Sequence, residues 1–286
     1  MTLAAMVLCA GFGTRLRPLT EERPKPLVPL GDHPLLAHVT RRLAQAGVTE
    51  LKLNVHHLKE EFDNLINELE IRPQVIHEPE IRGTAGGVAG AGFGARPVLV
   101  WNGDIWCDPP LAELCASTAP ITLLCAPRAV GEGSVGVGRS KQVVRLRGER
   151  FGEEVMGADF VGISRLSAEV VQALPEQGCL IGDVALPRLR GGQPVMTLPF
   201  TGEWSDLGTL GSYLEVNSRW LGERPSWVGE GAVIAPEVTL LRSVVGAGAR
   251  VLGHGALEGC VVWPGAVAEA PARGTVFGLT VRASLG

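Results

Sequence analysis

Two cationic side chains follow a glycine-rich segment near the start of the chain. Residues 8–18 read LCAGFGTRLRP, and Pro24-Lys25-Pro26 comes shortly afterwards. Glycine lets backbone N–H groups close on a phosphate chain, and Arg15 and Lys25 would add positive charge to it. A P-loop would carry its lysine directly after a glycine, and a dinucleotide fingerprint would need a third glycine where Leu16 stands. The segment therefore predicts a phosphate-binding loop of another kind.

Two aspartates are candidate metal ligands. Asp104 follows Gly103 at the end of an apolar run, and Asp206 follows a Trp-Ser pair. A divalent cation draws anionic phosphates together and takes up charge at the reacting phosphorus. Mg²⁺ prefers a few carboxylates plus substrate oxygens. Either aspartate alone would also suit a turn or the N-cap of a helix.

Five blocks, in this order, resemble the sugar-1-phosphate nucleotidylyltransferase family: AGFGTRLRPLT with PKP, GTAGG at 83–87, WNGD at 101–104, EWSDLGT at 203–209, and a repeat-containing tail. That family joins a nucleoside triphosphate to a sugar phosphate, releases pyrophosphate and has a Rossmann-like core. The resemblance implies that Arg15, Lys25 and Asp104 are catalytic and that Asp104 and Asp206 hold Mg²⁺. It implies nucleotide binding by Ala10, Gly11, Gly13, Thr14, Glu78, Gly83 and Thr84.

The sugar side matches the family less closely. Many members carry Glu-Lys-Pro a short distance before a glycine that lines the sugar pocket, and Glu149-Arg150-Phe151 stands in that place, with Gly162 after it. Arg150 would grip phosphate with a planar fork instead of a point charge. Asp183 resembles an acid that lines the sugar pocket. An exposed arginine and a helix start are the alternative interpretations of Arg150 and Asp183.

The choice of base depends on Glu78, just before Gly83 on the loop that reads the base in the family. A carboxylate accepts two adjacent hydrogen bonds, which matches the two donors of guanine better than the single donor of uracil. This favours GTP and mannose 1-phosphate, as in guanylyltransferases with a hexapeptide tail. GTAGG and NGDIW also resemble uridylyltransferases for N-acetylmuramate 1-phosphate, which generally lack the tail. UTP with that sugar phosphate or another hexose 1-phosphate therefore stays open.

Two other classes are weaker alternatives. A non-catalytic regulatory homologue would be expected to have lost Arg15, Lys25 or one of the aspartates, and all are present. An acyltransferase, with His254 as its base, would need more hexapeptide repeats to build a site for an acyl donor.

The positions of these motifs depend on alternating strands and helices. Such alternation predicts an α/β, Rossmann-like fold with a mostly parallel sheet and helices on both faces, and ligands bind beyond the carboxyl ends of its strands. We expect strands at 3–10, 51–55, 74–77 and 97–101, a strand-rich part at 121–162, and helices at 34–46, 60–69, 84–93, 168–174 and 209–221.

Apolar residues recur about every six positions near the end of the chain. This period indicates a short parallel β-helix of the left-handed type, whose coils take about 18 residues each. We expect a catalytic domain over 1–222 and a β-helix over 226–286. We also expect an apolar end at Val262 and Trp263, covered by the catalytic domain or by another subunit of a homo-oligomer. The repeat positions are Val228, Ile234, Leu240, Val245, Val251, Leu257 and Trp263.

Composition limits the partners. A net charge of −4 argues against broad nucleic-acid or membrane-surface binding, so the expected partners are small-molecule substrates. Six cysteines without zinc-like spacing indicate reduced thiols. With no apolar run long enough to span a membrane and no leader-like start, we expect a cytoplasmic protein.

Overall fold

The computed structural model describes residues 3–66 and 69–285 of the chain, which divides into two compact units. The first, here called the core unit, comprises residues 1–11, 40–59 and 65–204. The second, here called the tail unit, comprises residues 12–39, 60–64 and 205–286. The predicted domain boundary at residues 222–226 stays a prediction, because these units are defined by contacts and not by function.

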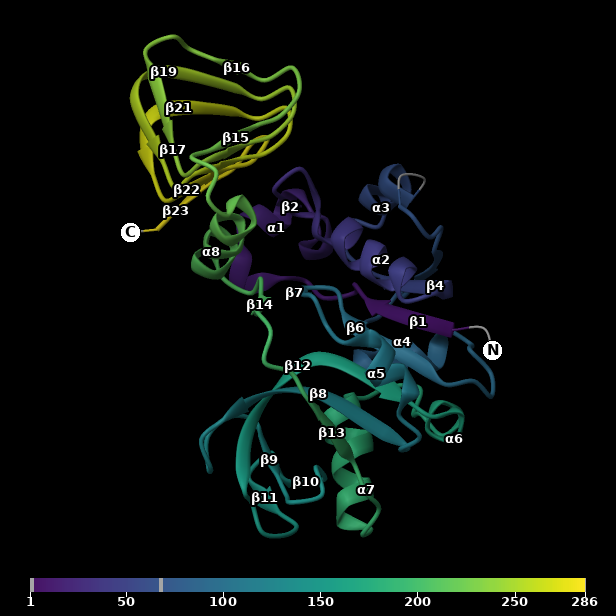
Figure 1. The fold of residues 1–286 in the computed structure, drawn as a ribbon. Helices are drawn as coiled ribbons and strands as arrows, with labels where there is room; N and C mark the ends of the chain where they lie inside the picture. Colours follow the sequence, from purple (N-terminus) through teal and green to yellow (C-terminus); the bar gives the residue numbers. More distant parts are fainter. Residues whose placement is uncertain (1–2, 67–68, 286) are drawn as a thin grey trace. The chain divides into compact units, whose positions relative to one another are not determined.

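A ten-stranded mixed sheet forms the centre of the core unit (Figure 1). Its parallel part has the order β6-β1-β4-β5, and β12 extends it by pairing antiparallel with β6, β8 and β9. The predicted mixed α/β architecture is confirmed. The ten strands are β1 (Leu3–Leu8), β4 (Val48–Val55), β5 (Gln74–His77), β6 (Val98–Asn102), β8 (Ile121–Arg128), β9 (Val135–Val137), β10 (Val143–Leu146), β11 (Glu149–Arg150), β12 (Met156–Leu166) and β13 (Met196–Pro199).

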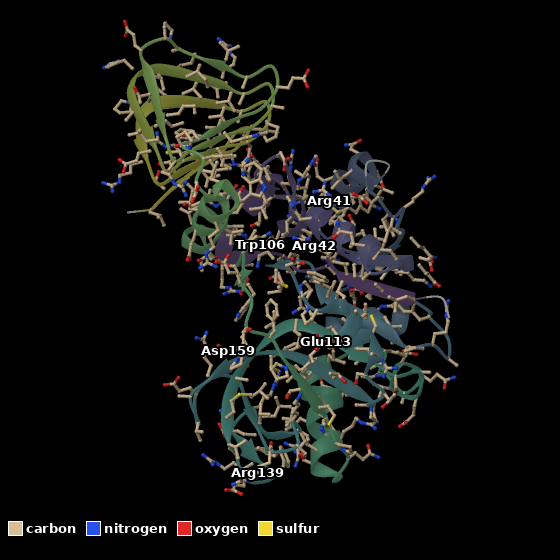
Figure 2. The ribbon with its side chains drawn as sticks, viewed as in Figure 1. Arg41, Arg42, Trp106, Glu113, Arg139 and Asp159 are labelled. Atoms are coloured by element: carbon tan, nitrogen blue, oxygen red, sulfur yellow. The ribbon has the colours of Figure 1, made fainter. Side chains whose placement is uncertain are left out.

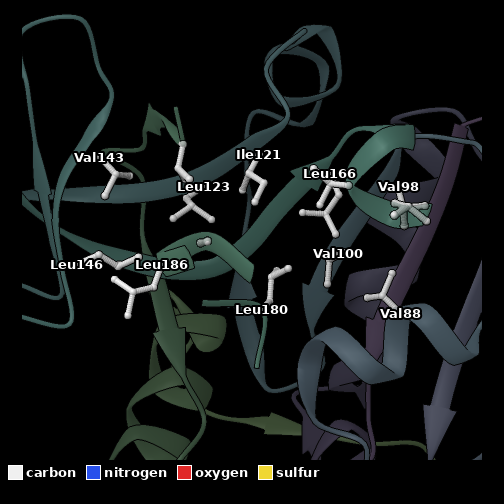
Figure 3. Close-up of a cluster of buried hydrophobic side chains, with 14 of the residues drawn as sticks. Val88, Val98, Val100, Ile121, Leu123, Val143, Leu146, Leu166, Leu180 and Leu186 are labelled. Carbon is white, nitrogen blue, oxygen red and sulfur yellow. The ribbon is translucent and has the colours of Figure 1, made fainter. Parts of the chain in front are cut away.

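Both faces of the parallel strands are covered. Four consecutive residues of β1, Ala4 to Val7, are buried although neighbouring side chains point to opposite faces. On one face, residues of β6 and β8, such as Val98, Val100 and Leu123, pack with Val88 of α4 (Gly83–Gly90) in the cluster of Figure 3. This apolar core fixes the strand ends that carry the candidate site.

Glycines let α4 lie against its neighbours. A Cβ on Gly86 would collide with the backbone oxygen of Glu176, and one on Gly87 would lie 2.7 Å from Nδ2 of Asn54. The GTAGG block is therefore needed for close packing as well as for any ligand.

The predicted helices are present with small shifts in their ends. The helix expected over 60–69 ends at Leu65, and residues 67–68 of that prediction lie outside the described residues. The other helices are α1 (Leu19–Glu22), α2 (Leu35–Gln45), α3 (Glu60–Leu65), α5 (Leu111–Ala116), α6 (Ala168–Gln172), α7 (Leu186–Arg190), α8 (Leu210–Leu221) and a π-helical turn, Leu180–Ala185.

In the tail unit, short parallel strands stack in two series. Trp227 pairs with Val244, Val244 with Val261 and Val261 with Val276, which gives the order β15-β18-β20-β22. A second series pairs β19 in parallel with β16, β17 and β21. The strands are β15 (Trp227–Val228), β16 (Val233–Ile234), β17 (Val238–Leu241), β18 (Val244–Val245), β19 (Arg250–Glu258), β20 (Val261–Val262), β21 (Val267–Arg273), β22 (Thr275–Phe277) and β23 (Arg282–Ser284).

The apolar end that the sequence predicts at Val262 and Trp263 is covered, as expected, because these residues are 1% and 0% exposed. Val228 and Val233, in the first strands of the stack, are 44% and 61% exposed. Trp263 is covered by a helix that precedes the repeats.

That helix is α8, and its contact with the repeats is polar as well as apolar. Nε1 of Trp263 donates to the hydroxyl of Tyr213 at 3.0 Å, and that hydroxyl donates to the carbonyl of Pro29 at 2.5 Å. Burial raises the pKa of Tyr213, so the hydroxyl stays protonated. Arg242 bridges the same parts of the chain by donating to the carbonyl of Ser218 at 2.8 Å. The repeats therefore pack on a helix of the expected catalytic domain.

Deleting residues 226–286 is expected to lower the melting temperature by more than about 4 °C, since uncovering Tyr213 and its neighbours would cost well over 1 kcal/mol. A melting curve and light scattering on the truncated chain would measure stability and mass. An unchanged melting temperature together with an unchanged mass would contradict this expectation.

Candidate active site

A left-handed glycine shapes the phosphate-binding loop. Gly13 has φ +64°, and its carbonyl accepts hydrogen bonds from the Leu16 amide at 2.9 Å and the Thr20 hydroxyl at 3.0 Å. A Cβ at this position would lie 2.8 Å from the Thr20 methyl group. The chain thus turns sharply at Gly13 into the 3-10 turn Thr14–Leu16, which carries Arg15. Only glycine combines this φ with this close approach at low cost.

Arg15 and Lys25 meet on one carboxylate. Nη2 of Arg15 lies 3.1 Å from Oδ2 of Asp206, and Nζ of Lys25 lies 4.0 Å from Oδ1. The Arg15 side chain is 62% exposed, so its ion pair contributes only about 0–1 kcal/mol and a phosphate could readily replace it. The Lys25 side chain is only 9% exposed, which holds its charge in a fixed place. Arg15, Lys25 and Asp206 therefore lie together within the tail unit.

Asp206 also has a carboxylate oxygen whose bonding is incomplete. Among the described residues its Oδ1 atom is buried and accepts no hydrogen bond. An unsatisfied buried carboxylate oxygen is costly, and a bound cation would satisfy it. Residues 3–66 and 69–285 contain no cluster of three or more acidic, cysteine or histidine side chains suited to a metal. An ion held here would take its other ligands from phosphate oxygens and water, as Mg²⁺ commonly does.

Asp104 follows β6 in the core unit. The Gly103 amide donates to the carbonyl of Leu8 at 2.9 Å, which ties the ends of β6 and β1 together. Burial, and then the charge of Asp104, raises the pKa of the Cys9 thiol, so this carboxylate lies close to the start of the glycine loop.

Two side chains, Arg42 and Trp101, contact the segment that follows Asp104. Arg42 of α2 pairs at 3.3 Å with Asp108, which follows β7 (Ile105–Cys107) in the sequence, and Figure 2 labels Arg42 and Trp106 of β7. The Trp101 indole N–H also donates to the carbonyl of Ile105 at 3.1 Å.

Glu78 lies where β5 ends and is 2% exposed. Its Oε1 accepts from Nδ2 of Asn54 at 2.9 Å, and its Oε2 accepts from the Arg82 amide at 3.1 Å. Oδ1 of Asn54 in turn accepts from the Cys9 amide at 2.9 Å. A carboxylate has about four acceptor positions, so these two bonds do not use them all. This network joins the ends of β1, β4 and β5.

Gly83 and Thr84 lock the start of α4 to the segment before the π-helical turn. Gly83 has φ +77°, and a Cβ there would lie 2.5 Å from the carbonyl oxygen of Gly178. The Thr84 hydroxyl accepts from the Leu180 amide at 2.7 Å, and the Gly178 amide donates to the carbonyl of Arg82 at 2.9 Å. The predicted base loop and the predicted sugar segment are thereby joined within the core unit.

Gly162 and Asp183, both predicted to line the sugar pocket, make close contacts within the core unit. Gly162, at φ +89°, lies in an irregular part of β12, and a Cβ there would lie 2.9 Å from Nδ2 of Asn102 and from Ile105. Asn102 and Ile105 flank Asp104 in the sequence. Asp183 accepts from the Cys179 amide at 2.6 Å and so closes the π-helical turn.

The recorded contacts of Glu149 and Arg150 are with Arg190 of α7 and with Glu154. Glu149 forms an ion pair with Arg190, whose hydrogen bonds lower the pKa of the carboxyl group. Arg150 is exposed, and its charge contributes to lowering the pKa of Glu154. Arg147, which the sequence analysis did not single out, donates to Sγ of Cys179 at 3.4 Å, and a Cβ on Gly182 would lie 2.9 Å from its Nη1. Arg147 has a backbone φ of +49°, which is uncommon for a residue other than glycine. The sequence pattern around it therefore does not indicate this conformation or the direction of its side chain.

The remaining loop residues differ in exposure. Ala10 is 5% exposed, whereas Gly11 and Thr14 are exposed, and a side chain at Gly11 would meet no atom within 4 Å. Space for a ligand therefore exists at Gly11.

Comparison with known proteins agrees with this geometry. Residues 4–130 match the protein-family model described as nucleotidyl transferase. A probable mannose-1-phosphate guanylyltransferase 1 of Oryza sativa subsp. japonica is 29% identical over 91% of this chain and 86% of its own length. The mannose-1-phosphate guanyltransferase of Schizosaccharomyces pombe is 30% identical over 74% of this chain, which covers 62% of that protein. Residues 4–130 are therefore similar to nucleotidyl transferases, and the longer similarities are to mannose-1-phosphate guanylyltransferases.

Solved structures share the fold. HddC from Yersinia pseudotuberculosis superposes with a TM-score of 0.64 at 21% identity, over 77% of this chain and 100% of HddC. A UDP-glucose pyrophosphorylase in complex with UDP-glucose gives a TM-score of 0.65 at 18% identity, over 78% of this chain and 100% of that one.

Nucleotidylyltransferases of this family generally use a divalent metal. Within the described residues, no helix is long and apolar enough to cross a membrane.

Asp104→Ala and Asp206→Ala are each expected to lower turnover by about 100-fold or more while the protein stays folded, since each removes a charge from a polar strand end and not from the apolar core. Pyrophosphate release and a melting curve would be measured together. Asp108→Ala, which removes an exposed carboxylate nearby, is the matched control. Activity within a few-fold of wild type for both variants would refute the two-aspartate metal site.

Proposed function

We propose that the protein is a mannose-1-phosphate guanylyltransferase, which converts GTP and mannose 1-phosphate into GDP-mannose and pyrophosphate. The observation that carries the proposal is the pair of cations, Arg15 and Lys25, on the single carboxylate of Asp206. Two anionic substrates must approach each other in this reaction, and fixed cations lower the cost of doing so. The named guanylyltransferases among the relatives support this choice of substrates.

In the proposed reaction, a phosphate oxygen of the sugar phosphate attacks the α-phosphorus of GTP. The new P–O bond forms as the bond to the β-phosphate bridging oxygen breaks, and pyrophosphate leaves. The attacking oxygen is already ionised, so no general base is required. Arg15 would stabilise the charge that develops on the α-phosphate, and Lys25 would hold the triphosphate and the sugar phosphate. These roles make Arg15 a determinant of kcat more than of KM.

We propose Mg²⁺ as the metal, with Asp104 and Asp206 as its protein ligands. When bound, it would neutralise phosphate charge and polarise the α-phosphate. The unpartnered Oδ1 of Asp206 supports this assignment. That oxygen lies 4.0 Å from Nζ of Lys25, a distance at which the lysine compensates its charge only in part.

Guanine selection is assigned to Glu78. Its contacts with Asn54 and the Arg82 amide fix the carboxylate in one orientation, and these two bonds do not use all of its acceptor positions. The backbone around Gly11, Gly13 and Gly83 would close on the nucleotide. UTP with N-acetylmuramate 1-phosphate is the second candidate, on the strength of the GTAGG and NGDIW blocks.

We infer that Arg147, together with Asp183 and Gly162, forms the sugar-phosphate side in preference to Arg150. Arg147→Gln is expected to raise the KM for the sugar phosphate by about tenfold or more, because a charged hydrogen bond to phosphate contributes more than 1 kcal/mol. Arg150→Gln is the matched control, with the KM for GTP measured in both variants. A large effect of Arg150→Gln with none of Arg147→Gln would return the role to Arg150.

The stacked strands of the tail unit are proposed to be a short left-handed-type β-helix over 226–286, following a catalytic domain over 1–222. Its strand pairings and its contact with α8 support this division. Exposed apolar residues on the first strands of the stack, such as Val233, support contact between subunits of a homo-oligomer. A cytoplasmic location stays a prediction.

A pyrophosphate-release screen tests the function directly. Five nucleoside triphosphates would be combined with mannose, glucose and N-acetylmuramate 1-phosphates in the presence of Mg²⁺. GTP with mannose 1-phosphate is expected to give the highest kcat/KM, since Glu78 offers two acceptors to guanine. A maximum with UTP would establish the second candidate. Absence of turnover with every pair, together with calorimetric binding of a nucleotide sugar, would indicate a regulatory homologue.

A further inference from the structure

Glu22 forms a concentrated set of hydrogen bonds with the end of the tail. Its Oε2 accepts from the Leu279 amide at 2.8 Å, and its Oε1 accepts from the Val281 amide at 2.8 Å. Oε1 also accepts from the amide and the hydroxyl of Thr280. A Cβ on Gly278 would collide with the carboxylate, so the backbone closes tightly around it. One side chain near the start of the chain thus holds three consecutive amides near its end.

The carboxylate is ionised at neutral pH. Partial burial raises the pKa of Glu22, but the four hydrogen bonds, led by that of the Thr280 hydroxyl, outweigh this effect and lower it below the usual range. Charge-assisted bonds of this kind are about twice as strong as neutral ones.

Glu22 lies between the two cations of the candidate site in the sequence. It ends α1, whose Thr20 hydroxyl donates to the carbonyl of Gly13, and Lys25 follows it by one short turn. The next residue, Arg23, places its guanidinium 5.5 Å from the ring centre of Trp263, in the same tail. The tail therefore holds residues 22 and 23, while Gly13 and Lys25 on either side shape the site.

We propose that Glu22 is a positioning residue for the transferase reaction, acting through the tail segment 279–281 to hold Arg15 and Lys25 in their productive geometry. The inference rests on the proposed nucleotidyl transfer. Catalysis by fixed cations depends on their being in place before the charge develops, and small displacements are costly. The tail is then part of the catalytic apparatus and not only a stabilising appendage.

The test uses Glu22→Gln in the full chain. Glutamine keeps the shape but turns an NH₂ group toward backbone donors, so at least one bond is lost. The expected result is a fall in kcat of about tenfold with a smaller change in the KM for GTP, because the effect falls on the transition state. Glu21→Gln is the matched control, since Glu21 is an exposed neighbour whose ion pair with Arg17 spans 3.8 Å. Thr280→Val, which lacks the hydroxyl group, should show the same fall in kcat, whereas Thr280→Ser, which keeps it, should retain wild-type activity.

A double-mutant cycle separates positioning from general stability. If Glu22 acts through Arg15, Glu22→Gln should have little further effect on kcat in an Arg15→Ala background. The same fold-loss in both backgrounds, or a kcat of Glu22→Gln within twofold of wild type, would overturn the proposal.

Hydrogen exchange of residues 12–28 gives a readout that needs no turnover. Faster exchange of this segment in Glu22→Gln than in Glu21→Gln is expected, and equal exchange would overturn the proposal. A wild-type protein without turnover on any substrate pair would refute the proposed function, while the exchange comparison would still decide whether Glu22 orders the loop.

Discussion

Two positive charges must lie close together wherever two phosphates are to be joined, and like charges repel when no phosphate is present. Asp206 resolves this conflict, since one of its oxygens pairs with Arg15 and the other faces Lys25. Lys25 is nearly buried, and a buried charge without a compensating partner is costly. Around Asp206, Gly208 leaves room for the guanidinium of Arg15, because a Cβ there would lie 2.6 Å from Nη2. In the SDLGT block, Asp206 thus supplies the carboxylate, Gly208 leaves space for the Arg15 side chain, and Thr209 caps α8.

The need to keep Arg15 and Lys25 close together also explains why the glycine loop is short and fixed by several hydrogen bonds. Gly13 accepts two hydrogen bonds and takes a left-handed φ, so the turn that carries Arg15 starts from a fixed point. The chain pays for such order in conformational entropy, at about 1–2 kcal/mol per residue. Contacts distant in the sequence offset that cost, and those of Glu22 span 257 residues or more. A loop of this composition would otherwise sample many conformations.

Sequence patterns predicted the strands and the motifs at their ends, because apolar runs and glycine turns act locally. The parallel part of the sheet and the placement of Asp104 and Glu78 after β6 and β5 follow from them. The contacts that depend on distant segments could not be predicted in this way. The apolar period predicts that Trp263 is covered, but not that Tyr213 of α8 covers it. The contact of Arg147 with Cys179 could not be predicted, because it depends on an unusual backbone conformation and on a turn more than thirty residues away.

The proposed base loop and the proposed sugar segment are joined by hydrogen bonds within the core unit. The loop that carries Glu78 ends in Gly83 and Thr84, which bond to the segment that leads into Asp183. Moving either segment alone would break the bonds of Gly178 and Leu180, each contributing about 1 kcal/mol, and would leave buried backbone groups unpaired. A change of base preference by substitution at Glu78 would therefore be confined to side-chain contacts, because the backbone that presents this residue is also the backbone that shapes the sugar side.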